Sequence, residues 1–260
     1  MLKRLFLAIM LFAAAGQAAA VDYTDIWWIP AEAGWGVNVV QSDSFVFVTF
    51  FIYGADGKPT WYTANLYLDA TGNFNGLLYA TTGTPFALPW VPAQVIQAPV
   101  GTASFQPTGP STAKLVYILT SGPILATVTK SIQRQTLTTI TVGGGYVGGQ
   151  TGTYSGCSPS SSNGPYKDFF DDLQVTQLTN QSVTFAFIYT NVSCTLSGTL
   201  VQQGQLYSVP TATYQCSDGL NTTATMTEIK ATAQGIEGRF SAPSVGGNCR
   251  EDAQFSGVLE

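Results

Sequence analysis

The chain has 260 residues, of which 45% are hydrophobic and only 10% are charged, and its formal net charge is −5. Ordinary soluble domains carry about 25% charged residues, so this composition excludes a disordered acidic segment and a coiled coil. Because the sequence contains no histidine, it also excludes Ser-His-Asp and Cys-His catalysis and histidine-bound metals. The 27 glycines and 13 prolines, together with many threonines, favour an all-β protein rich in turns.

The first 20 residues predict a secretory signal peptide. Lys3 and Arg4 precede the apolar stretch Leu5–Ala15, which is short for a membrane span, and the small residues Ala18 and Ala20 precede the expected cleavage site. A retained membrane anchor is the alternative. Cleavage removes two of the ten basic residues and leaves eight against fifteen acidic ones. We therefore expect an exported protein, in the periplasm or outside a Gram-negative bacterium.

The charge distribution narrows the range of partners. An acidic chain with scattered Lys and Arg lacks the basic surface that binds nucleic acid or an anionic membrane. No later stretch offers 18 uninterrupted apolar residues, so we expect no integral membrane span after cleavage. An outer-membrane barrel is disfavoured, because segments such as 133–141 and 219–227 are polar on both faces.

The first half of the chain predicts a series of antiparallel strands. Ser44–Tyr53 is apolar on both faces, so we expect this strand to be covered on both sides. The Asp56-Gly57 pair predicts a hairpin that returns through Thr60–Leu68. Further strands are expected over residues 36–41, 74–81, 101–106, 113–120 and 124–135. The proline-rich segment Pro85–Pro99 is expected to be an extended loop.

The second half combines short strands with recurring glycines. Gly198, Gly238 and Gly257 each lie between larger residues, which is typical of barrel corners. Val183–Thr190 alternates as a strand should, and only Tyr166–Leu173 predicts a short helical turn.

The two halves differ in composition, which indicates two domains. All five tryptophans lie in the first half and all four cysteines in the second, and the glycine-rich segment 143–149 between them predicts a flexible linker. We expect two tandem β domains, residues 21–142 and residues 150–260, folded as antiparallel meander sheets or small up-and-down β-barrels. One continuous sandwich or barrel is the alternative.

The four cysteines predict two disulfides, since an even number in an exported chain is usually paired. Three pairings are possible, and we favour Cys157–Cys194 with Cys216–Cys249, which would join neighbouring strands of a meander. A four-cysteine metal site is the alternative. The cysteines are spaced by 37, 22 and 33 residues, whereas metal ligands usually come in close pairs. We therefore expect no metal site and no cofactor.

The most distinctive run is residues 27–36, WWIPAEAGWG, preceded by DYTD at 22–25 and followed by DGKPTW at 56–61. This arrangement resembles the opening of a family of uncharacterised secreted proteobacterial proteins, whose pattern is Asp-Tyr-(Thr/Ser)-Asp-x-Trp-Trp, Pro-x-Glu-Ser-Gly-Trp-Gly and Asp-Gly-(Lys)-Pro-x-Trp. The resemblance spans residues 22–62 and implies export and β architecture, with no reaction attached. The chain departs from the pattern at Ile29 and Ala33, which argues against catalytic roles for the polar groups expected there.

The aromatic run predicts a recognition surface, because tryptophan faces stack on sugars or apolar ligands and a carboxylate accepts hydrogen bonds from hydroxyls. The candidate ligand-binding residues are Trp27, Trp28, Glu32, Trp35, Trp61 and Trp90. Packing in the core is the alternative for each tryptophan. Since Trp27 and Trp28 are adjacent on an extended chain, they point to opposite faces, and we expect one of them to be exposed.

No constellation of residues predicts catalysis with any specificity. For an enzyme, Glu32 and Asp25 are the candidate carboxylates of a glycoside hydrolase. The preferred hypothesis is an exported, non-enzymatic β protein that binds a glycan or another cell-envelope component through its N-terminal aromatic surface. The alternatives are a calycin-like barrel that holds a small apolar ligand, a carboxylate-dependent glycoside hydrolase, and a surface-structural or assembly protein.

Overall fold

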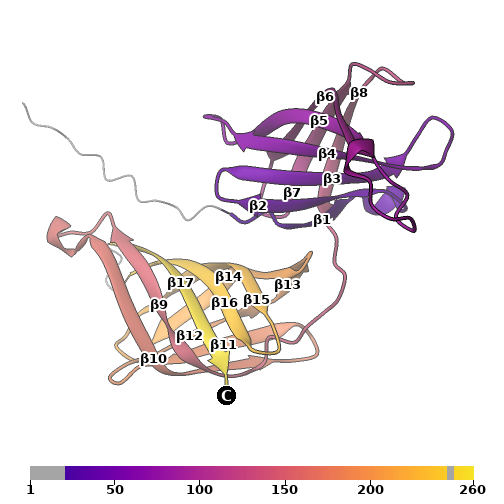
Figure 1. Ribbon diagram of the computed structural model, residues 1–260. Coiled ribbons are helices and arrows are strands. Elements are labelled where there is room, and N and C mark those ends of the chain that lie inside the picture. Colours follow the sequence, from indigo (N-terminus) through magenta and orange to yellow (C-terminus); the bar gives the residue numbers. More distant parts are fainter. Residues whose placement is uncertain (1–20, 245–248) are drawn as a thin grey trace, which may run out of the picture.

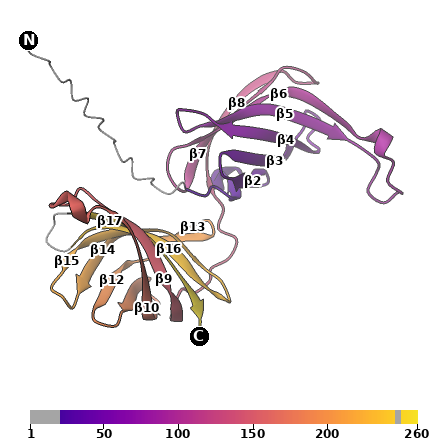
Figure 2. The same cartoon turned by 60° about the vertical axis from the view of Figure 1, so that its left-hand side comes forward.

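The structure, a computed structural model, describes residues 21–244 and 249–260, so the predicted signal peptide lies outside the described residues. Two antiparallel sheets each close into a barrel of eight strands (Figures 1 and 2), which confirms the prediction of an all-β protein with two barrel domains. In the part of the chain that is described, no helix has the length and apolar character needed to cross a membrane.

Barrel 1 is an up-and-down barrel in which each strand pairs with the next. Its strands are β1 (Asp25–Trp28), β2 (Gly36–Ser42), β3 (Phe45–Tyr53), β4 (Pro59–Leu68), β5 (Phe74–Thr82), β6 (Ile96–Pro107), β7 (Thr112–Leu119) and β8 (Ala126–Arg134). The short 3-10 helices η1 (Pro30–Glu32) and η2 (Pro92–Gln94) lie in the β1–β2 and β5–β6 connections. β8 returns to pair with β1, with Arg134 opposite Trp27, and this pairing closes the barrel.

The interior of barrel 1 is filled by apolar side chains, because alternate residues of every strand point inward. Trp27, Phe50 and Phe105 are fully buried, and the rings of Trp27 and Phe105 meet edge to face with centroids 5.0 Å apart. Trp27 is therefore a core residue, as the alternative interpretation of the tryptophans held. Trp28 points the other way and is half-buried, which agrees with the expected opposition of the two side chains.

The prediction that β3 is covered on both faces was wrong. Its inward residues Val46, Val48 and Phe50 are fully buried, but the outward residues Phe47 and Tyr53 are 37% and 56% exposed. A strand in a single barrel wall has one face on the core and one on the outside, whereas the prediction assumed a second layer. The apolar outer face of β3 is therefore left exposed by the described residues, 21–244 and 249–260.

Barrel 2 repeats the architecture. Its strands are β9 (Gly144–Ser155), β10 (Gly164–Gln177), β11 (Ser182–Ile188), β12 (Ser193–Thr199), β13 (Val201–Gln203), β14 (Leu206–Cys216), β15 (Asn221–Ala231), β16 (Gly235–Pro243) and β17 (Arg250–Leu259). β12 and β13 pair with successive parts of β14 and so share one position in the wall, which gives eight positions from nine strands. β17 pairs with β9, so the last strand of the barrel lies beside the first. The short 3-10 helix η3 (Ser160–Ser162) lies between β9 and β10.

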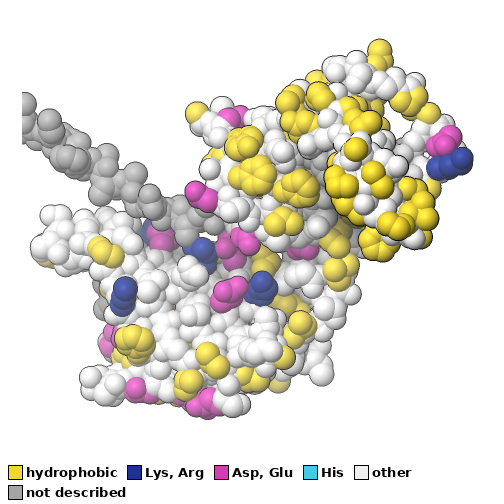
Figure 3. Space-filling model, viewed as in Figure 1, with side chains coloured by type: hydrophobic (Ala, Val, Ile, Leu, Met, Phe, Trp, Pro, Cys, Tyr) yellow, Lys and Arg dark blue, Asp and Glu magenta, His cyan; other side chains and the backbone are white. Residues whose placement is uncertain are grey.

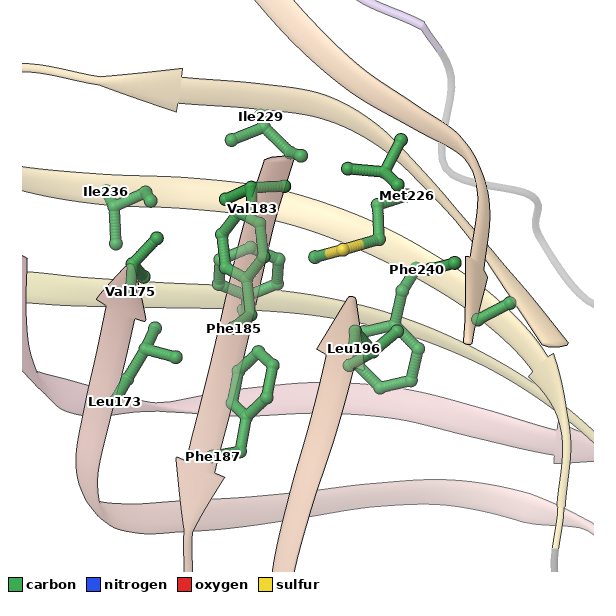
Figure 4. Close-up of a cluster of buried hydrophobic side chains, with 14 of the residues drawn as sticks. Leu173, Val175, Val183, Phe185, Phe187, Leu196, Met226, Ile229, Ile236 and Phe240 are labelled. Atoms are coloured by element: carbon green, nitrogen blue, oxygen red, sulfur yellow. The ribbon is translucent and has the colours of Figure 1, made fainter. Parts of the chain in front are cut away.

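The core of barrel 2 is aromatic. Figure 4 shows Phe185 and Phe187 of β11 directed toward side chains of the opposite wall, among them Phe240 of β16. The rings of Phe187 and Phe255 meet edge to face with centroids 5.4 Å apart. Phe170 joins the same group, with its ring centroid 5.6 Å from that of Phe187. This aromatic cluster fills the middle of the barrel.

Two local predictions in the second half are corrected by the structure. The glycine-rich segment 143–149, predicted as a linker, lies almost wholly within β9, and residues 135–143 make the strand-free connection between the barrels. A Cβ at Gly148 would lie 2.1 Å from the carbonyl oxygen of Ser256, so glycine there serves close strand packing. Tyr166–Leu173 belongs to β10, whose irregular register between Phe170 and Leu173 broke the alternation that indicates a strand.

The disulfides are Cys157–Cys249 and Cys194–Cys216, so the favoured pairing was wrong. That pairing joined cysteines adjacent in the chain, but barrel closure places the end of β9 beside the start of β17. Cys194 and Cys216 are direct cross-strand partners on β12 and β14. Two disulfides are typical of proteins in an oxidising, exported environment.

A buried ion pair lies where barrel 1 meets barrel 2. The guanidinium of Arg134 contacts Asp25 at 3.1 Å, and both side chains are at most 3% exposed. The guanidinium also donates to the carbonyl oxygens of Pro110, Thr24 and Asp22 and lies 5.0 Å from the centre of the Trp27 ring. Asp25 in turn accepts the backbone N–H of Gln205 from the β13–β14 turn. This arrangement joins the closing seam of barrel 1 to barrel 2.

Candidate functional site

Four of the five tryptophans gather toward one end of barrel 1. Because neighbouring strands are antiparallel, the β1–β2, β3–β4, β5–β6 and β7–β8 connections all lie at the same end, opposite the turn whose Ser111 contacts Gln203 of barrel 2. We call this the loop end; its connections are residues 29–35, 54–58, 83–95 and 120–125. Trp28 comes directly before the first connection, Trp35 is its last residue, and Trp90 lies within the β5–β6 connection. Trp61 is near the start of β4.

An aromatic face runs along the outer side of β3 and β4, from Tyr67, which is opposite Phe45 at the start of β3, to Tyr53 at the loop end. We define it as Phe47, Phe51, Tyr53, Trp61 and Tyr67. Phe51 and Trp61 are direct cross-strand partners, and they are 41% and 54% exposed. Contiguous exposed aromatic side chains are costly in water, and on a soluble domain they commonly mark a binding surface.

The glycines of the WWIPAEAGWG run make room for this aromatic face. A Cβ at Gly36 would lie 2.8 Å from the ring of Phe51, so the ring rests directly on the backbone of β2. Gly34 has a φ of +115°, which favours glycine, and its backbone lies beneath the hydroxyl of Tyr53. The run at 27–36 and the aromatic strand at 45–53 are thus two parts of one surface.

Glu32 forms a small polar cluster at the loop end. Its Oε2 accepts hydrogen bonds from Trp35 Nε1 at 3.0 Å and from Lys130 Nζ at 2.5 Å, and Lys130 also lies 5.4 Å from the centre of the Trp35 ring. The hydrogen bond from Lys130 is the main cause that lowers the pKa of Glu32. Glu32 is therefore ionised at neutral pH, which suits a hydrogen-bond acceptor and not a general acid.

The candidate hydrolase carboxylates do not share a site. Asp25 begins β1 and pairs with Arg134, whereas Glu32 follows the end of β1 and pairs with Lys130. The two basic partners are four residues apart on β8, which corresponds to about 13 Å along a strand. Asp25 is also covered by the β13–β14 turn of barrel 2. The structure brings each carboxylate to its own cation and not to the other carboxylate.

The β5–β6 connection extends the apolar character of the loop end. Figure 3 shows hydrophobic side chains gathered over barrel 1 at the upper right of the view, and fewer over barrel 2. In the β5–β6 connection and the first residue of β6 the exposed apolar side chains are Phe86, Leu88, Trp90, Val91, Val95 and Ile96. The hydroxyl of Thr84 accepts the backbone N–H of Val91 at 2.9 Å, which holds the loop together across its base.

Barrel 2 contains a cavity, lined by carboxyl, amide and tyrosine side chains, that sequence reasoning missed. The cavity has a volume of about 320 Å³ and lies at the mouth of the barrel where both disulfides are. Its lining includes Gln150, Tyr154, Asp168, Tyr189, Tyr214, Asp218 and Glu251. These residues are scattered through the sequence over several strands and two turns, since Tyr189 follows β11 and Asp218 lies between β14 and β15. No local pattern joins them, because they come together only when the barrel closes.

Glu251 is the central group of this cavity. Glu251 is only 4% exposed, and its carboxylate accepts a hydrogen bond from the hydroxyl of Tyr166. Gln150 extends the network: its Nε2 donates to the Tyr166 hydroxyl at 3.2 Å, and its Oε1 accepts from the Tyr189 hydroxyl at 2.9 Å. These contacts join Glu251, Tyr166, Gln150 and Tyr189 in one hydrogen-bonded chain.

Burial sets the protonation states in the cavity. Loss of hydration raises the pKa of the Glu251 carboxyl, and the tyrosine hydroxyls lower it by a smaller amount. Burial raises the pKa of Tyr154 to about 12 and raises the pKa values of Tyr166, Tyr189 and Tyr214 as well. The four tyrosines are therefore neutral hydrogen-bond donors throughout the physiological range.

Comparison with protein-family models gave no match to this chain, and comparison with curated proteins gave no similar sequence. The molecule presents two candidate binding surfaces, the aromatic face of barrel 1 and the cavity of barrel 2.

Proposed function

We propose that this chain is an exported, non-enzymatic binding protein that recognises a glycan of the cell envelope through the aromatic face of barrel 1. The observation that carries the proposal is the exposed cross-strand pair of Phe51 and Trp61, with Tyr53 beside them. Flat aromatic side chains bind the apolar faces of sugar rings, and a rigid strand pair holds them in place at low entropic cost.

The polar residues of the same face favour a sugar over a purely apolar partner. The outward positions of β3 and β4 alternate rings with Thr49 and Asn65, which lie between the aromatic pairs. Tyr53 adds a hydroxyl, and the ionised Glu32 adds an acceptor at the loop end. A sugar ring has apolar faces and hydroxyl edges, so alternating aromatic and polar groups complement both.

The separate ion pairs of Asp25 and Glu32 favour binding over glycoside hydrolysis. The disulfides and the predicted signal peptide support a location in the periplasm or outside the cell. The similarity of residues 22–62 to secreted proteobacterial proteins fits the same location and remains part of the proposal.

Calorimetry and tryptophan fluorescence test the proposal on residues 21–260. All five tryptophans lie in barrel 1, so fluorescence reports on that barrel when soluble polysaccharides, peptidoglycan fragments and lipid vesicles are titrated. We expect a saturable change with a glycan, and Trp61→Ala should weaken calorimetric binding at least about tenfold, as for aromatic anchors at other interfaces.

The matched control is Phe169→Ala, which removes an exposed aromatic side chain from the outside of barrel 2 and should leave affinity unchanged. No response to any glycan, or equal losses in the two variants, would refute glycan binding by the aromatic face. Concentration-dependent self-association without a glycan response would instead support the assembly protein considered from the sequence.

A further inference from the structure

The cavity of barrel 2 carries negative charge that no described residue neutralises. Asp168, Asp218 and Glu251 line it, and no Lys or Arg is among its described lining residues. Within the described chain, Glu251 makes no ion pair, although its residue is 96% removed from solvent. A buried carboxylate without a cation is unfavourable, because hydrogen bonds replace only part of its lost hydration. A cation bound beside Glu251 would offset this cost.

The walls of the cavity are aromatic. Tyr154, Tyr189 and Tyr214 line it, and the ring of Tyr154 stacks on that of Tyr166 with centroids 4.8 Å apart. The ring of Tyr214 also contacts Phe240 of the aromatic core, with centroids 5.8 Å apart. These ring contacts hold Tyr154 and Tyr214 in place, and the face of an aromatic ring attracts a cation, most strongly when the cation is desolvated.

Volume and rigidity restrict the occupant to a small molecule. About 320 Å³ lies at the lower end of the range for ligand pockets. Cys194, Cys216 and Cys249 lie in the rim, and their two disulfides hold the strands that carry the tyrosines and Glu251. Three carboxyl groups and three tyrosines line the cavity, which favours a positively charged ligand over the small apolar ligand considered from the sequence.

We propose that barrel 2 binds a small organic cation, a primary or methylated ammonium group, with Glu251 as its counter-ion and Tyr154, Tyr189 and Tyr214 as its aromatic walls. Tyr166 is a positioning residue, because it donates to Glu251 and does not line the cavity. This site is separate from the aromatic face of barrel 1 and does not depend on glycan binding.

The test compares choline with 3,3-dimethylbutan-1-ol, a neutral molecule of the same shape, by calorimetry on residues 21–260. Choline and ethanolamine represent the two ammonium classes. We expect at least one of them to bind at least about tenfold more tightly than the neutral alcohol, because only the cation gains from Glu251 and the π faces. Equal binding of cation and alcohol, or no binding of either cation, would overturn the proposal.

Two variants locate the site. Glu251→Gln keeps the volume and removes the charge, and it should weaken cation binding at least about tenfold. The matched control is Asp252→Asn, which removes the adjacent outward carboxylate that pairs with Arg250 at 3.1 Å, and it should change affinity less than about twofold. Equal losses would indicate nonspecific charge attraction. The comparison of choline with its isostere uses the unaltered protein and stays decisive if a variant fails to fold.

Vesicles of phosphatidylcholine separate a free ammonium compound from a lipid headgroup. The proposal expects binding of free choline, and stronger binding of vesicles that is lost in Glu251→Gln would assign the headgroup as the natural source. Vesicle binding that persists in Glu251→Gln would place lipid contact elsewhere on the protein, and the choline comparison would then decide the cavity on its own.

Discussion

The buried ion pair between Arg134 and Asp25 allows a quantitative test of how barrel 1 is closed. Arg134→Met keeps much of the apolar stem over Trp27 but leaves the Asp25 carboxylate without its cation in a site that is 3% exposed. Removal of one partner of a buried pair typically costs about 3–5 kcal/mol, since the other charge stays buried and uncompensated. With a urea m-value of about 1.5 kcal/mol per molar, the unfolding midpoint of barrel 1 should fall by about 2–3 M.

Tryptophan fluorescence is the appropriate assay, because all five tryptophans lie in barrel 1 and the transition of barrel 2 does not contribute. Combining Arg134→Met with Asp25→Asn also removes the unpaired charge of Asp25, and the double variant should recover more than half of the lost stability. The control Lys114→Met, at an exposed position on β7, should stay within about 0.5 kcal/mol of the wild type. A loss below about 1 kcal/mol in Arg134→Met, or no recovery in the double variant, would show that the ion pair does not hold the seam.

Two further predictions concern barrel 2. Replacing Cys157 and Cys249 by serine should destabilise it by about 4.6 kcal/mol, and replacing Cys194 and Cys216 by about 3.4 kcal/mol, because the first bond spans 92 residues and the second 22. Urea unfolding followed by far-UV circular dichroism gives both values. If the second loss were the larger, loop length would not set the stabilisation. Burial raises the folded-state pKa of Glu251 above its ordinary 4.5, so the folded protein holds this proton more tightly than the unfolded chain, and stability falls as pH rises from 4.5 through the folded value. Glu251→Gln should therefore be more stable than the wild type at pH 7, by about 1.4 kcal/mol for each pKa unit by which folding raises the pKa of Glu251. This advantage should disappear below pH 4. An advantage that is the same at both pH values would show that the pKa of Glu251 is not raised in the folded protein.

Local sequence patterns predicted the strands well, because strand alternation and tight turns depend only on residues that are close together in the chain. The expected strand 60–68 is β4 (Pro59–Leu68), and the Asp56-Gly57 pair lies in the β3–β4 connection as expected. Alternation also predicted the opposed directions of Trp27 and Trp28. These features need only the period of two residues along a strand and the chemistry of tight turns.

Barrel closure could not be predicted from the sequence, and the wrong predictions about the disulfides and β3 follow from this. Pairing of β1 with β8 and of β9 with β17 joins residues at least 95 positions apart, for which no local pattern exists. The disulfide pairing, the outward face of β3 and the cavity around Glu251 all depend on these two seams. The glycines at 143–149 indicated flexibility because their role, close approach between strands, is visible only when the partner strands are known.

The two disulfides of barrel 2 make nested covalent rings. The Cys157–Cys249 bond encloses a loop that contains the whole Cys194–Cys216 loop, and the outer bond ties the first strand of the barrel to the last. A protease that cuts the backbone once anywhere between 157 and 249 therefore releases no fragment until the bonds are reduced. Outside the cytoplasm, where peptidases are common and thiols are oxidised, a nicked molecule of this kind keeps all of its strands in one covalent unit.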